Sequence, residues 1–367
     1  MNVLPSGRLP AGGLPAGGHP AHHAEARHTG DVVLDVRNLS ISFPTEEGEV
    51  KAVSDLSYQA RLGRTLAIVG ESGSGKSVSS MALLGLHDRN RTRITGSIRL
   101  DGEELVGAPE STYQDLRSTT VAMVFQDPQS SLHPFYKVGW QIAEAYRTHN
   151  DVPKAVAARR AVEMLEVVGI PDPQRRAKQY PHEFSGGMRQ RAMIALALVN
   201  DPKLLIADEP TTALDVTVQA QILDLVKDLQ REFGSAVLLI THDLAVVAEV
   251  ADDILVMYAG RAVETGLAKE VLAQPSMPYT YGLLRSLPSP SEDLQQLRTI
   301  PGSPPSMLSL PSGCAFHPRC PFSGQVRGDA CWTRLPELRP TPRMVNRQLR
   351  CHLQDPVRTL RAEEGRR

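Results

Sequence analysis

The most informative stretch of the 367-residue sequence is Gly70-Glu71-Ser72-Gly73-Ser74-Gly75-Lys76-Ser77. It fits the pattern G-x-x-x-x-G-K-[ST]. It also stands between an apolar run at 66–69 and a helical pattern, which is the strand–loop–helix context of a phosphate-binding loop. Glycines let backbone N–H groups approach a phosphate closely, and the N-terminus of the following helix adds its positive dipole end. The Lys76 ammonium would then lie between the β- and γ-phosphates of a nucleotide, and the Ser77 hydroxyl would bind Mg²⁺.

A second apolar run, at 204–207, ends in two carboxylates, Asp208 and Glu209. Two acids after a strand are common by themselves, but together with the phosphate loop they indicate a site that hydrolyses a nucleotide. Asp208 at the end of the strand would hold Mg²⁺ together with Ser77. Glu209, one residue further along, could take a proton from the attacking water.

The composition of the whole chain indicates which class of protein carries this site. The chain is 41% hydrophobic and 22% charged, with a net charge of −1, which is enough apolar material for a sizeable core and for two domains. No stretch approaches the ~20 consecutive apolar residues that cross a bilayer, and no apolar segment of the kind found in a secretory signal follows Met1. Four cysteines are too few for a disulfide-dense secreted scaffold. We therefore expect a soluble cytoplasmic protein.

Before the first cysteine, the chain divides into an N-terminal extension and a longer region that contains a helical insert. Residues 1–30 are rich in Gly, Pro, Ala and His, and we expect a disordered extension there. Between 31 and 274 strand and helix patterns alternate, which predicts a parallel α/β sheet. A helical insert interrupts this pattern between about 130 and 185, where Pro153 suits a helix start and Gly169 a helix end. The expected strands are 32–43, 65–69, 121–125, 204–207, 237–240 and 254–257, and the expected helix after the acidic pair is 216–232.

The region after residue 274 has a different composition and pattern. Prolines become frequent, helical periodicity fades, and all four cysteines lie here, so we expect a small loop-rich domain at 275–353 and a basic tail at 354–367. From Tyr281 to Arg367 there are 13 Arg, no Lys and 7 acidic residues. This excess predicts a solvated, Arg-rich tail, with contact to a membrane surface or an anionic partner as the alternative.

Other motifs resemble those of ATP-binding-cassette (ABC) ATPases. The signature is Phe184-Ser185-Gly186-Gly187-Met188-Arg189-Gln190, in which Phe184 replaces the usual Leu and the Ser-Gly-Gly is intact. Gln126 matches the family's Q-loop, Ala213-Leu214-Asp215 its D-loop, and Thr241-His242-Asp243 its switch histidine. The resemblance implies an α/β fold: a phosphate-loop ABC-type nucleotide-binding domain with a helical insert, plus a small Cys-containing loop-rich C-terminal domain.

The resemblance also implies roles for individual residues. Ser185, Gly186 and Gly187 begin a helix whose free N–H groups make a second anion site. In the family this site closes over the ATP of a partner in a head-to-tail dimer. The implied catalytic residues are Glu209, His242 and Gln126, and the implied Mg²⁺ ligands are Ser77, Gln126 and Asp208. The implied ATP-binding residues are Phe43, Gly70, Glu71, Ser72, Gly73, Ser74, Gly75, Lys76, Ser77, Ser185, Gly186, Gly187 and Asp215. Phe43 would stack on adenine, or would simply belong to the core.

The sequences of these motifs are similar to those of oligopeptide/dipeptide importer ATPases. They include Phe125-Gln126-Asp127-Pro128 and Pro210-Thr211-Thr212-Ala213-Leu214-Asp215, and the tail adds Cys314-Ala315-Phe316-His317-Pro318-Arg319-Cys320. This resemblance implies a peripheral ATPase at the cytoplasmic face of the inner membrane. Its implied partners are two transmembrane permease subunits, a sister ABC ATPase in a heterodimer (or a second copy of this chain) and an extracytoplasmic peptide-binding protein, with no nucleic acid. The alternatives are a nickel or other small-solute importer ATPase and a non-transport ABC ATPase.

The cysteines are spaced C-x5-C-x10-C-x19-C at Cys314, Cys320, Cys331 and Cys351. The C-x2-4-C knuckle of structural zinc sites is missing from this pattern. Relatives in this importer group are thought to carry a [4Fe–4S] cluster, and the resemblance implies one on these four residues. The alternatives are four reduced thiols that bind nothing, zinc, or disulfides. Because this domain is expected to lie outside the phosphate site, we expect any cluster there to be structural or to affect docking.

Overall fold

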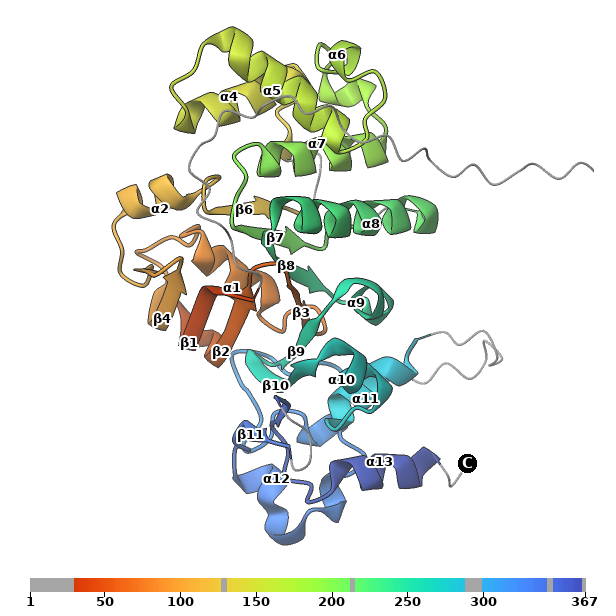
Figure 1. Cartoon of the computed structure of the whole chain (residues 1–367). Helices are drawn as coiled ribbons and strands as arrows, with labels where there is room; N and C mark the ends of the chain where they lie inside the picture. Colours follow the sequence, from red (N-terminus) through yellow and green to blue (C-terminus); the bar gives the residue numbers. More distant parts are fainter. Residues whose placement is uncertain (1–29, 127–130, 212–214, 288–298, 342–345, 365–367) are drawn as a thin grey trace, which may run out of the picture.

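A computed structural model describes residues 30–126, 131–211, 215–287, 299–341 and 346–364. Apart from Gly30, the predicted N-terminal extension lies outside these residues, as do Asp127 and Pro128 after the Q-loop glutamine and Ala213 and Leu214 of the D-loop. Figure 1 shows a helical insert at one end of the molecule, the sheets in the middle and the C-terminal region at the other end.

The larger sheet is built around parallel strands. Its strands are β3 (Thr65–Val69), β6 (Val121–Val124), β7 (Leu204–Asp208), β8 (Ala236–Thr241), β9 (Asp253–Tyr258), β10 (Arg261–Leu267), β11 (Arg339–Pro340) and β12 (Gln348–Leu349). They lie in the order β11-β12-β10-β9-β3-β8-β7-β6, and β9, β3, β8, β7 and β6 are parallel. Every residue of β3, β7 and β8 is buried, as expected for a parallel sheet covered on both faces. The strands predicted at 65–69, 121–125, 204–207, 237–240 and 254–257 are confirmed.

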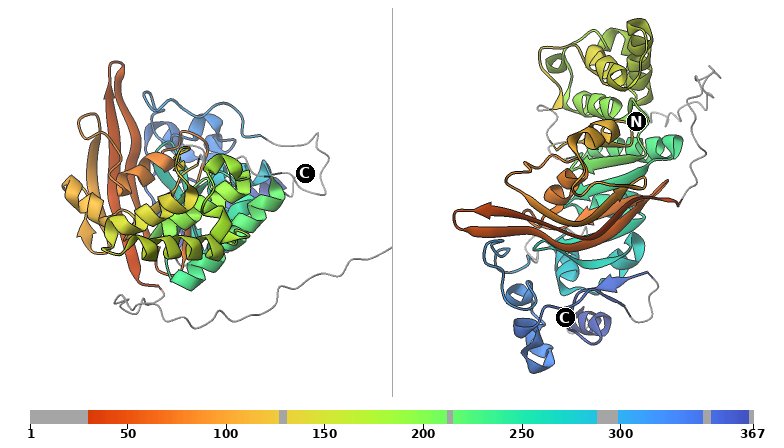
Figure 2. Two further views of the ribbon diagram at one scale, coloured as in Figure 1. Left: turned by 90° about the horizontal axis from the view of Figure 1, so that it is seen from above. Right: turned by 90° about the vertical axis from the view of Figure 1, so that its left-hand side faces the viewer.

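A second, antiparallel sheet packs beside the first. Its strands are β1 (Val32–Thr45), β2 (Gly48–Arg61), β4 (Arg93–Leu100) and β5 (Glu103–Glu104), in the order β2-β1-β4-β5. Figure 2 shows that the β1–β2 hairpin extends to one side of the molecule. The sequence pattern predicts β1 but not its partners. Buried side chains from both sheets share one hydrophobic cluster, so this hairpin is fixed against the strand that leads into the phosphate loop.

Helices cover the larger sheet and form the insert. They are α1 (Lys76–Leu83), α2 (Glu110–Leu116), α4 (Val138–His149), α5 (Lys154–Val167), α6 (Pro173–Arg176), α7 (Gly186–Leu198), α8 (Val216–Phe233), α9 (Leu244–Val250), α10 (Ala268–Ala273), α11 (Pro278–Arg285), α12 (Ala330–Thr333) and α13 (Pro356–Glu364). Short 3₁₀ turns are η1 (Pro181–Glu183), η3 (His317–Arg319), η4 (Ser323–Gln325) and η5 (Arg327–Asp329). Pro153 precedes α5 as its N-cap, and Gly169, with φ of 71°, follows its last turn. The helix predicted at 216–232 is α8.

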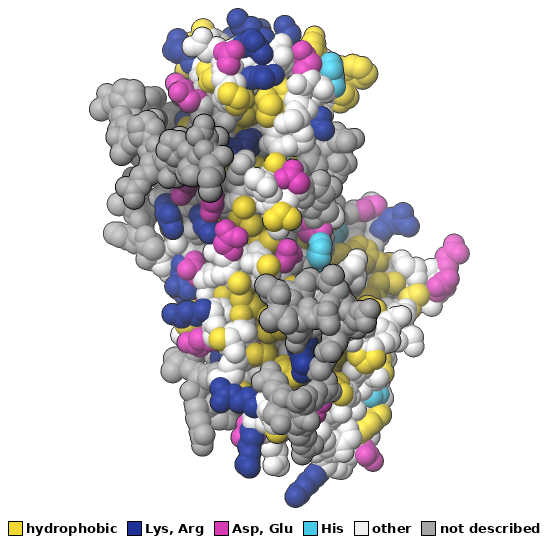
Figure 3. Space-filling view, turned by 90° about the vertical axis from the view of Figure 1, so that its right-hand side faces the viewer, with side chains coloured by type: hydrophobic (Ala, Val, Ile, Leu, Met, Phe, Trp, Pro, Cys, Tyr) yellow, Lys and Arg dark blue, Asp and Glu magenta, His cyan; other side chains and the backbone are white. Residues whose placement is uncertain are grey.

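The C-terminal region shares its core with the ATPase sheet. Strand β12 pairs with β10, and residues of β3 and β9 pack in the same buried cluster as Cys314, Phe316 and Cys351. The expectation that the arginines of this region are solvated is wrong for Arg319, Arg347 and Arg350, which are all buried. Their charges are used in internal contacts, whereas the exposed Lys and Arg side chains in Figure 3 are spread over the surface from the insert to the C-terminal region.

No helix among the described residues is both long and apolar enough to cross a bilayer.

Candidate nucleotide site

The phosphate loop connects β3 to α1 and requires glycine at two positions. Gly75 has φ of 99°, and a Cβ there would lie 2.4 Å from the carbonyl oxygen of Ala52. A Cβ on Gly70 would lie 2.3 Å from the carbonyl oxygen of Met257. Both neighbours are backbone atoms that cannot move aside, so the loop can pack against β2 and β9 only if these residues lack a side chain.

Lys76 is buried at the first position of α1. Its Nζ donates hydrogen bonds to the carbonyl oxygens of Gly70 at 2.7 Å and Glu71 at 3.0 Å. Burial lowers the pKa of Lys76, and the negative charges of Glu209, Asp208 and Glu71 oppose this shift. The ammonium group is therefore held inside the loop with three carboxylates around it.

Ser77 and Asp208 provide a pair of oxygen ligands next to Lys76. Ser77 Oγ donates to Asp208 Oδ1 at 3.3 Å. Burial raises the pKa of Asp208, and the hydrogen bond from Ser77 partly offsets it. A buried carboxylate beside a hydroxyl suits Mg²⁺, which typically takes one or two protein carboxylates and completes its shell with phosphate and water oxygens. The described residues contain no cluster of three or more His, Cys, Asp or Glu placed to hold a metal, and this mode of Mg²⁺ binding does not need one.

Two of the predicted catalytic residues, Gln126 and His242, each contact the third, Glu209. Gln126 Nε2 donates to Glu209 Oε2 at 2.9 Å, and His242 Nδ1 lies 3.1 Å from Glu209 Oε1. Glu209 has φ of 48°, in the left-handed region that non-glycine residues rarely adopt. A strained backbone and a contact to each carboxylate oxygen fix the direction of the side chain, as a general base requires.

The signature motif lies at the start of α7. Ser185 caps this helix, because its Oγ accepts a hydrogen bond from the Met188 N–H at 3.3 Å. Asp215 caps α8 in the same way. Residues from both helix starts line a hollow of about 370 Å³, and none of the described residues that line it belongs to the phosphate loop. Its lining residues are Ser185, Gly186, Gly187, Met188, Arg191, Asp215, Val218 and Gln221.

Phe43 is half-buried near the end of β1. Its ring meets His87 edge to face, with the ring centroids 5.7 Å apart, and it borders the core cluster of the two sheets. It pairs with Val50 on β2, the strand whose Ala52 touches the phosphate loop. The position is compatible with both roles that the sequence allowed, adenine stacking and core packing.

Two residues that the sequence analysis did not place in the site contact the phosphate loop. Arg319 makes a two-pronged ion pair with Glu71, and the Tyr279 hydroxyl accepts a hydrogen bond from the Glu71 N–H. The expectation that the C-terminal domain lies outside the phosphate site is therefore wrong. Glu71 and Arg319 are separated by 248 positions in the sequence. The only signal in the sequence was that each carries a charge for which no partner had been assigned.

The four cysteines are free thiols of the C-terminal region. Burial raises the pKa of Cys314 to about 11 and those of Cys320 and Cys351 to about 12, and it also raises the pKa of Cys331. They are therefore neutral at physiological pH. The predicted [4Fe–4S] cluster receives no support from the geometry, because no three cysteines in the described part of the chain are gathered as metal ligands.

Comparisons with known proteins identify the family of the chain. Residues 53–212 match the family model described as ABC transporter, and residues 263–326 match the one described as Oligopeptide/dipeptide transporter, C-terminal region. The chain is 50% identical over 305 residues to the oligopeptide transport ATP-binding protein OppD of Escherichia coli (strain K12), which covers 83% of this chain and 90% of the relative. It is 51% identical over 296 residues to OppD of Bacillus subtilis (strain 168), covering 80% and 83%.

Solved structures give the same result for the fold. The ATP-binding cassette MJ0796, in a dimeric post-hydrolysis state bound to ADP and Pi, matches 64% of this chain and 98% of its own, with a TM-score of 0.57 and 26% identity. The protein cbiO1 from Clostridium perfringens, part of the ABC transporter complex cbiONQ, matches 66% of this chain and 91% of its own, with a TM-score of 0.57 and 27% identity. With its phosphate loop, signature helix and both family matches, the chain belongs to the ATP-binding-cassette transporter ATPases, in the family that carries the oligopeptide/dipeptide transporter C-terminal region.

Proposed function

We propose that this ABC ATPase hydrolyses ATP to power the uptake of di- and oligopeptides through two separate membrane permease subunits. One observation carries the proposal: the 50% identity to an oligopeptide transport ATPase spans 90% of that relative, and the C-terminal region has its own match. An extracytoplasmic peptide-binding protein would deliver the peptide. The chain would lie peripherally at the cytoplasmic face of the inner membrane.

The proposed chemistry assigns each residue of the site one task. Lys76 and the backbone N–H groups of Gly70–Gly75 bind the β- and γ-phosphates of ATP, while Ser77, Asp208 and Gln126 hold Mg²⁺. When bound, the metal neutralises charge on the phosphate oxygens. Glu209 takes the proton from the attacking water. His242 orients the Glu209 carboxylate and contacts the γ-phosphate.

The signature hollow supports a head-to-tail dimer. Its helix start can bind an anion, yet its lining includes none of the phosphate-loop residues of the same chain. We propose that Ser185, Gly186 and Gly187 close over the ATP of a sister ABC ATPase, and that Asp215 stands at the same interface. Co-purification of a tagged chain from its native cells tests the pairing: a second, different ABC ATPase supports a heterodimer, and recovery of this chain alone supports a homodimer.

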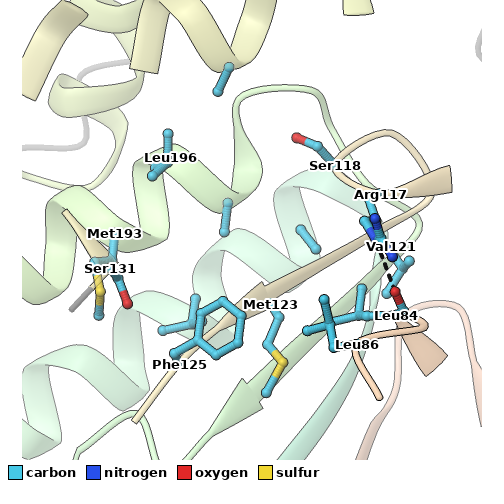
Figure 4. Close-up of a pocket in the computed structure, with 14 residues that line it drawn as sticks. Leu84, Leu86, Arg117, Ser118, Val121, Met123, Phe125, Ser131, Met193 and Leu196 are labelled. Atoms are coloured by element: carbon cyan, nitrogen blue, oxygen red, sulfur yellow. Dashed lines mark hydrogen bonds between the residues drawn. The ribbon is translucent and has the colours of Figure 1, made fainter. Parts of the chain in front are cut away.

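An apolar groove beside the Q-loop suits a membrane subunit. It measures about 610 Å³, between β6 and α7, and Figure 4 shows the side chains of Phe125 and Met123 facing it from one side and Met193 and Leu196 from the other. Phe125 directly precedes Gln126, which bonds the general base. We propose that an apolar segment of a permease subunit occupies this groove. Gln126→Ala should then uncouple ATP hydrolysis from transport in the assembled complex; unchanged coupling would remove Gln126 from this role.

A [4Fe–4S] cluster on Cys314, Cys320, Cys331 and Cys351 is a separate proposal with chemical support only. Soft thiol ligands suit iron–sulfur clusters. Cys314, Cys320 and Cys351 belong to or pack against one buried cluster, and the Cys314 N–H donates to the carbonyl oxygen of Cys331. The described arrangement does not form a metal site, so no step of the mechanism uses the cluster. Iron analysis of anaerobically purified protein tests it: about four irons per chain supports it, and zinc or no metal refutes it.

Transport assays test the proposed function directly. Cells that lack this chain should lose uptake of labelled di- and oligopeptides, and the parent chain should restore it. The Lys76→Ala variant should fail to restore it, because it cannot hold the phosphates of ATP. Intact peptide uptake in the deletion strain, or loss of nickel uptake instead, would contradict the peptide assignment.

A further inference from the structure

Arg319 links the C-terminal region to the phosphate loop. It ends the 3₁₀ turn η3, between Cys314 and Cys320, and is 6% exposed. Its Nη1 lies 2.6 Å from Glu71 Oε2 and its Nη2 lies 2.9 Å from Glu71 Oε1. Both carboxylate oxygens of the second residue of the loop are therefore held by one guanidinium, in the two-pronged geometry that only arginine provides.

The guanidinium cannot easily move away from this position. Its Nε donates to the carbonyl oxygen of Pro301 at 3.0 Å, and its Nη1 also lies 3.4 Å from the Tyr258 hydroxyl. The rings of Tyr258 and Phe316 lie 5.9 and 6.0 Å from the guanidinium carbon. Hydrogen bonds with Glu71 raise the pKa of Arg319 above its usual range, so the positive charge is permanent.

Glu71 is fixed at its backbone as well as its side chain. Its N–H donates to the hydroxyl of Tyr279, a fully buried residue of α11, at 2.9 Å. Its carbonyl oxygen accepts a hydrogen bond from Lys76 Nζ. The residue that receives the C-terminal contacts is therefore the same residue that touches the phosphate-binding lysine.

The charge of Glu71 gives this contact an electrostatic consequence. A carboxylate in a loop that binds the phosphates of ATP would repel them unless a cation neutralised it. Arg319 is such a cation, buried on the side of Glu71 that belongs to the C-terminal region. Without Arg319, Glu71 would be left with an uncompensated charge and a freer side chain.

We propose that Arg319 is a positioning residue for ATP binding, which sets the conformation and charge of the phosphate loop through Glu71. The inference rests on the ATP site of the proposed function and extends it: the C-terminal region is a working part of the nucleotide site. Arg319 acts through Glu71 and not by contact with the nucleotide.

The test compares ATP affinity in the purified full-length chain, with a fluorescent ATP analogue as the probe. Arg319→Met, which keeps the unbranched apolar part of the side chain and removes its charge, should weaken binding by about 10-fold. Arg319→Lys should give a smaller loss, because it keeps the charge without the two-pronged contact. Adding Glu71→Gln to Arg319→Met should recover part of the affinity, because the repelling carboxylate is removed. A purely structural role of Arg319 predicts no such recovery.

Arg350 supplies a matched control in the same region. It is 5% exposed, donates to the carbonyl oxygens of Ala262 at 2.9 Å and Pro336 at 3.1 Å, and pairs with Asp55 at 3.5 Å, and none of these partners belongs to the phosphate loop. Arg350→Met should lower thermal stability as Arg319→Met does, yet leave ATP affinity at the parental value. Affinities are measured well below the melting temperature of each variant, so that partial unfolding does not contribute.

The outcomes separate this inference from the proposed function. If the parent chain binds ATP, Lys76→Ala abolishes binding and both Arg319 variants bind like the parent, the inference is overturned while the ATP site stands. Equal losses in Arg319→Met and Arg350→Met, with no recovery on adding Glu71→Gln, also overturn it. If Arg319→Met does not fold, Arg319→Lys decides: parental affinity in that variant excludes the positioning role. A parent chain that binds no ATP overturns the proposed function itself.

Discussion

At the scale of single residues, Glu209 combines strain with two side-chain contacts. Its backbone lies at φ of 48°, and its N–H donates to the carbonyl oxygen of Ile240, so the residue is tied to the end of β8. Gln126 and His242 each contact one of its carboxylate oxygens. Nine other described non-glycine residues also have a positive φ, so this conformation points to a reactive position only together with the two side-chain contacts.

Replacing Glu209 with Gln should separate binding from hydrolysis. The amide keeps the shape of the side chain but cannot accept a proton, so ATP hydrolysis should fall by about 100-fold or more while ATP binding persists. Phosphate release by the assembled complex and binding of a fluorescent ATP analogue measure the two effects. Lys76→Ala is the contrasting variant, in which binding itself should be lost. Phosphate release near the parental rate in Glu209→Gln would exclude Glu209 as the base.

Asp208 should make the stability of the chain depend on pH. Burial raises its pKa, which means that the folded chain bears a cost for the carboxylate charge at neutral pH. That cost is absent at acidic pH, where the group is protonated in both folded and unfolded states, and it appears as the pH rises through the folded-state pKa. Asp208→Asn carries no charge at any pH. It should therefore unfold at a higher temperature than the parent at neutral pH, and the difference should shrink as the pH falls.

Thermal unfolding at a series of pH values measures this effect. The exposed Asp115→Asn provides the control, and it should track the parent throughout. Asp208→Asn should at the same time lose Mg²⁺-dependent ATP binding, which would make it a stabilised and inactive chain. A lower melting temperature at neutral pH would show that the hydrogen bond from Ser77 and the attraction to the Lys76 charge outweigh the cost of burying Asp208.

At the scale of helices and strands, local patterns explain what the sequence could predict. Strands β3 and β7 are short runs of apolar residues followed directly by the phosphate loop and the acidic pair, so both strand and site could be identified from neighbouring residues. The alternation of Leu56, Tyr58 and Ala60 with polar residues is a pattern typical of a strand, and it could have predicted β2. Turn η3 has no such pattern, and its role depends on a partner in a distant part of the chain.

Ser185, at the N-terminus of α7, has a structural role and a proposed catalytic role. It caps α7 through Met188, and the proposed function also places it against the phosphate of a partner chain. Asp and Asn cap helices about as well as Ser. Ser185→Asp should thus keep the melting temperature but reduce ATP hydrolysis by the assembled complex by about 10-fold or more, because a carboxylate repels the phosphate.

Ser185→Asn is the matched control for this prediction, since it preserves the cap without adding charge. Its ATP hydrolysis should stay much closer to that of the parent. Phosphate release and thermal unfolding are measured on the same preparations. Equal hydrolysis by the Asp and Asn variants would place the signature helix away from any phosphate.

At the scale of the whole molecule, a buried ion pair fastens the C-terminal region to the ATPase sheet. Glu264 of β10 and Arg347, which precedes β12, are both fully buried, with Arg347 Nε 3.2 Å from Glu264 Oε1. Glu264 also accepts hydrogen bonds from the N–H groups of Ser276 and Met277. Three chain segments therefore meet at one carboxylate.

Removing Arg347 should destabilise the chain strongly. Arg347→Met leaves Glu264 charged and buried without its cation, which typically costs about 3–5 kcal/mol in the free energy of unfolding. Denaturant titration measures the loss, and the exposed Arg358→Met should change it little. Adding Glu264→Gln should recover part of the stability. A loss below about 1 kcal/mol, the value of a surface pair, would show that this pair does not fasten the two regions.

The pairing of β3 also determines when the site can form during synthesis of the chain. Thr65 pairs with Val237 on one side, and Leu66 pairs with Asp253 on the other. The phosphate loop follows this strand, but both of its strand neighbours leave the ribosome long after it does, and Arg319 leaves later still. Sheets built from such distant partners assemble slowly and only after the late segments are available. The nascent chain therefore carries its phosphate loop through most of translation and becomes able to hold ATP only near the end.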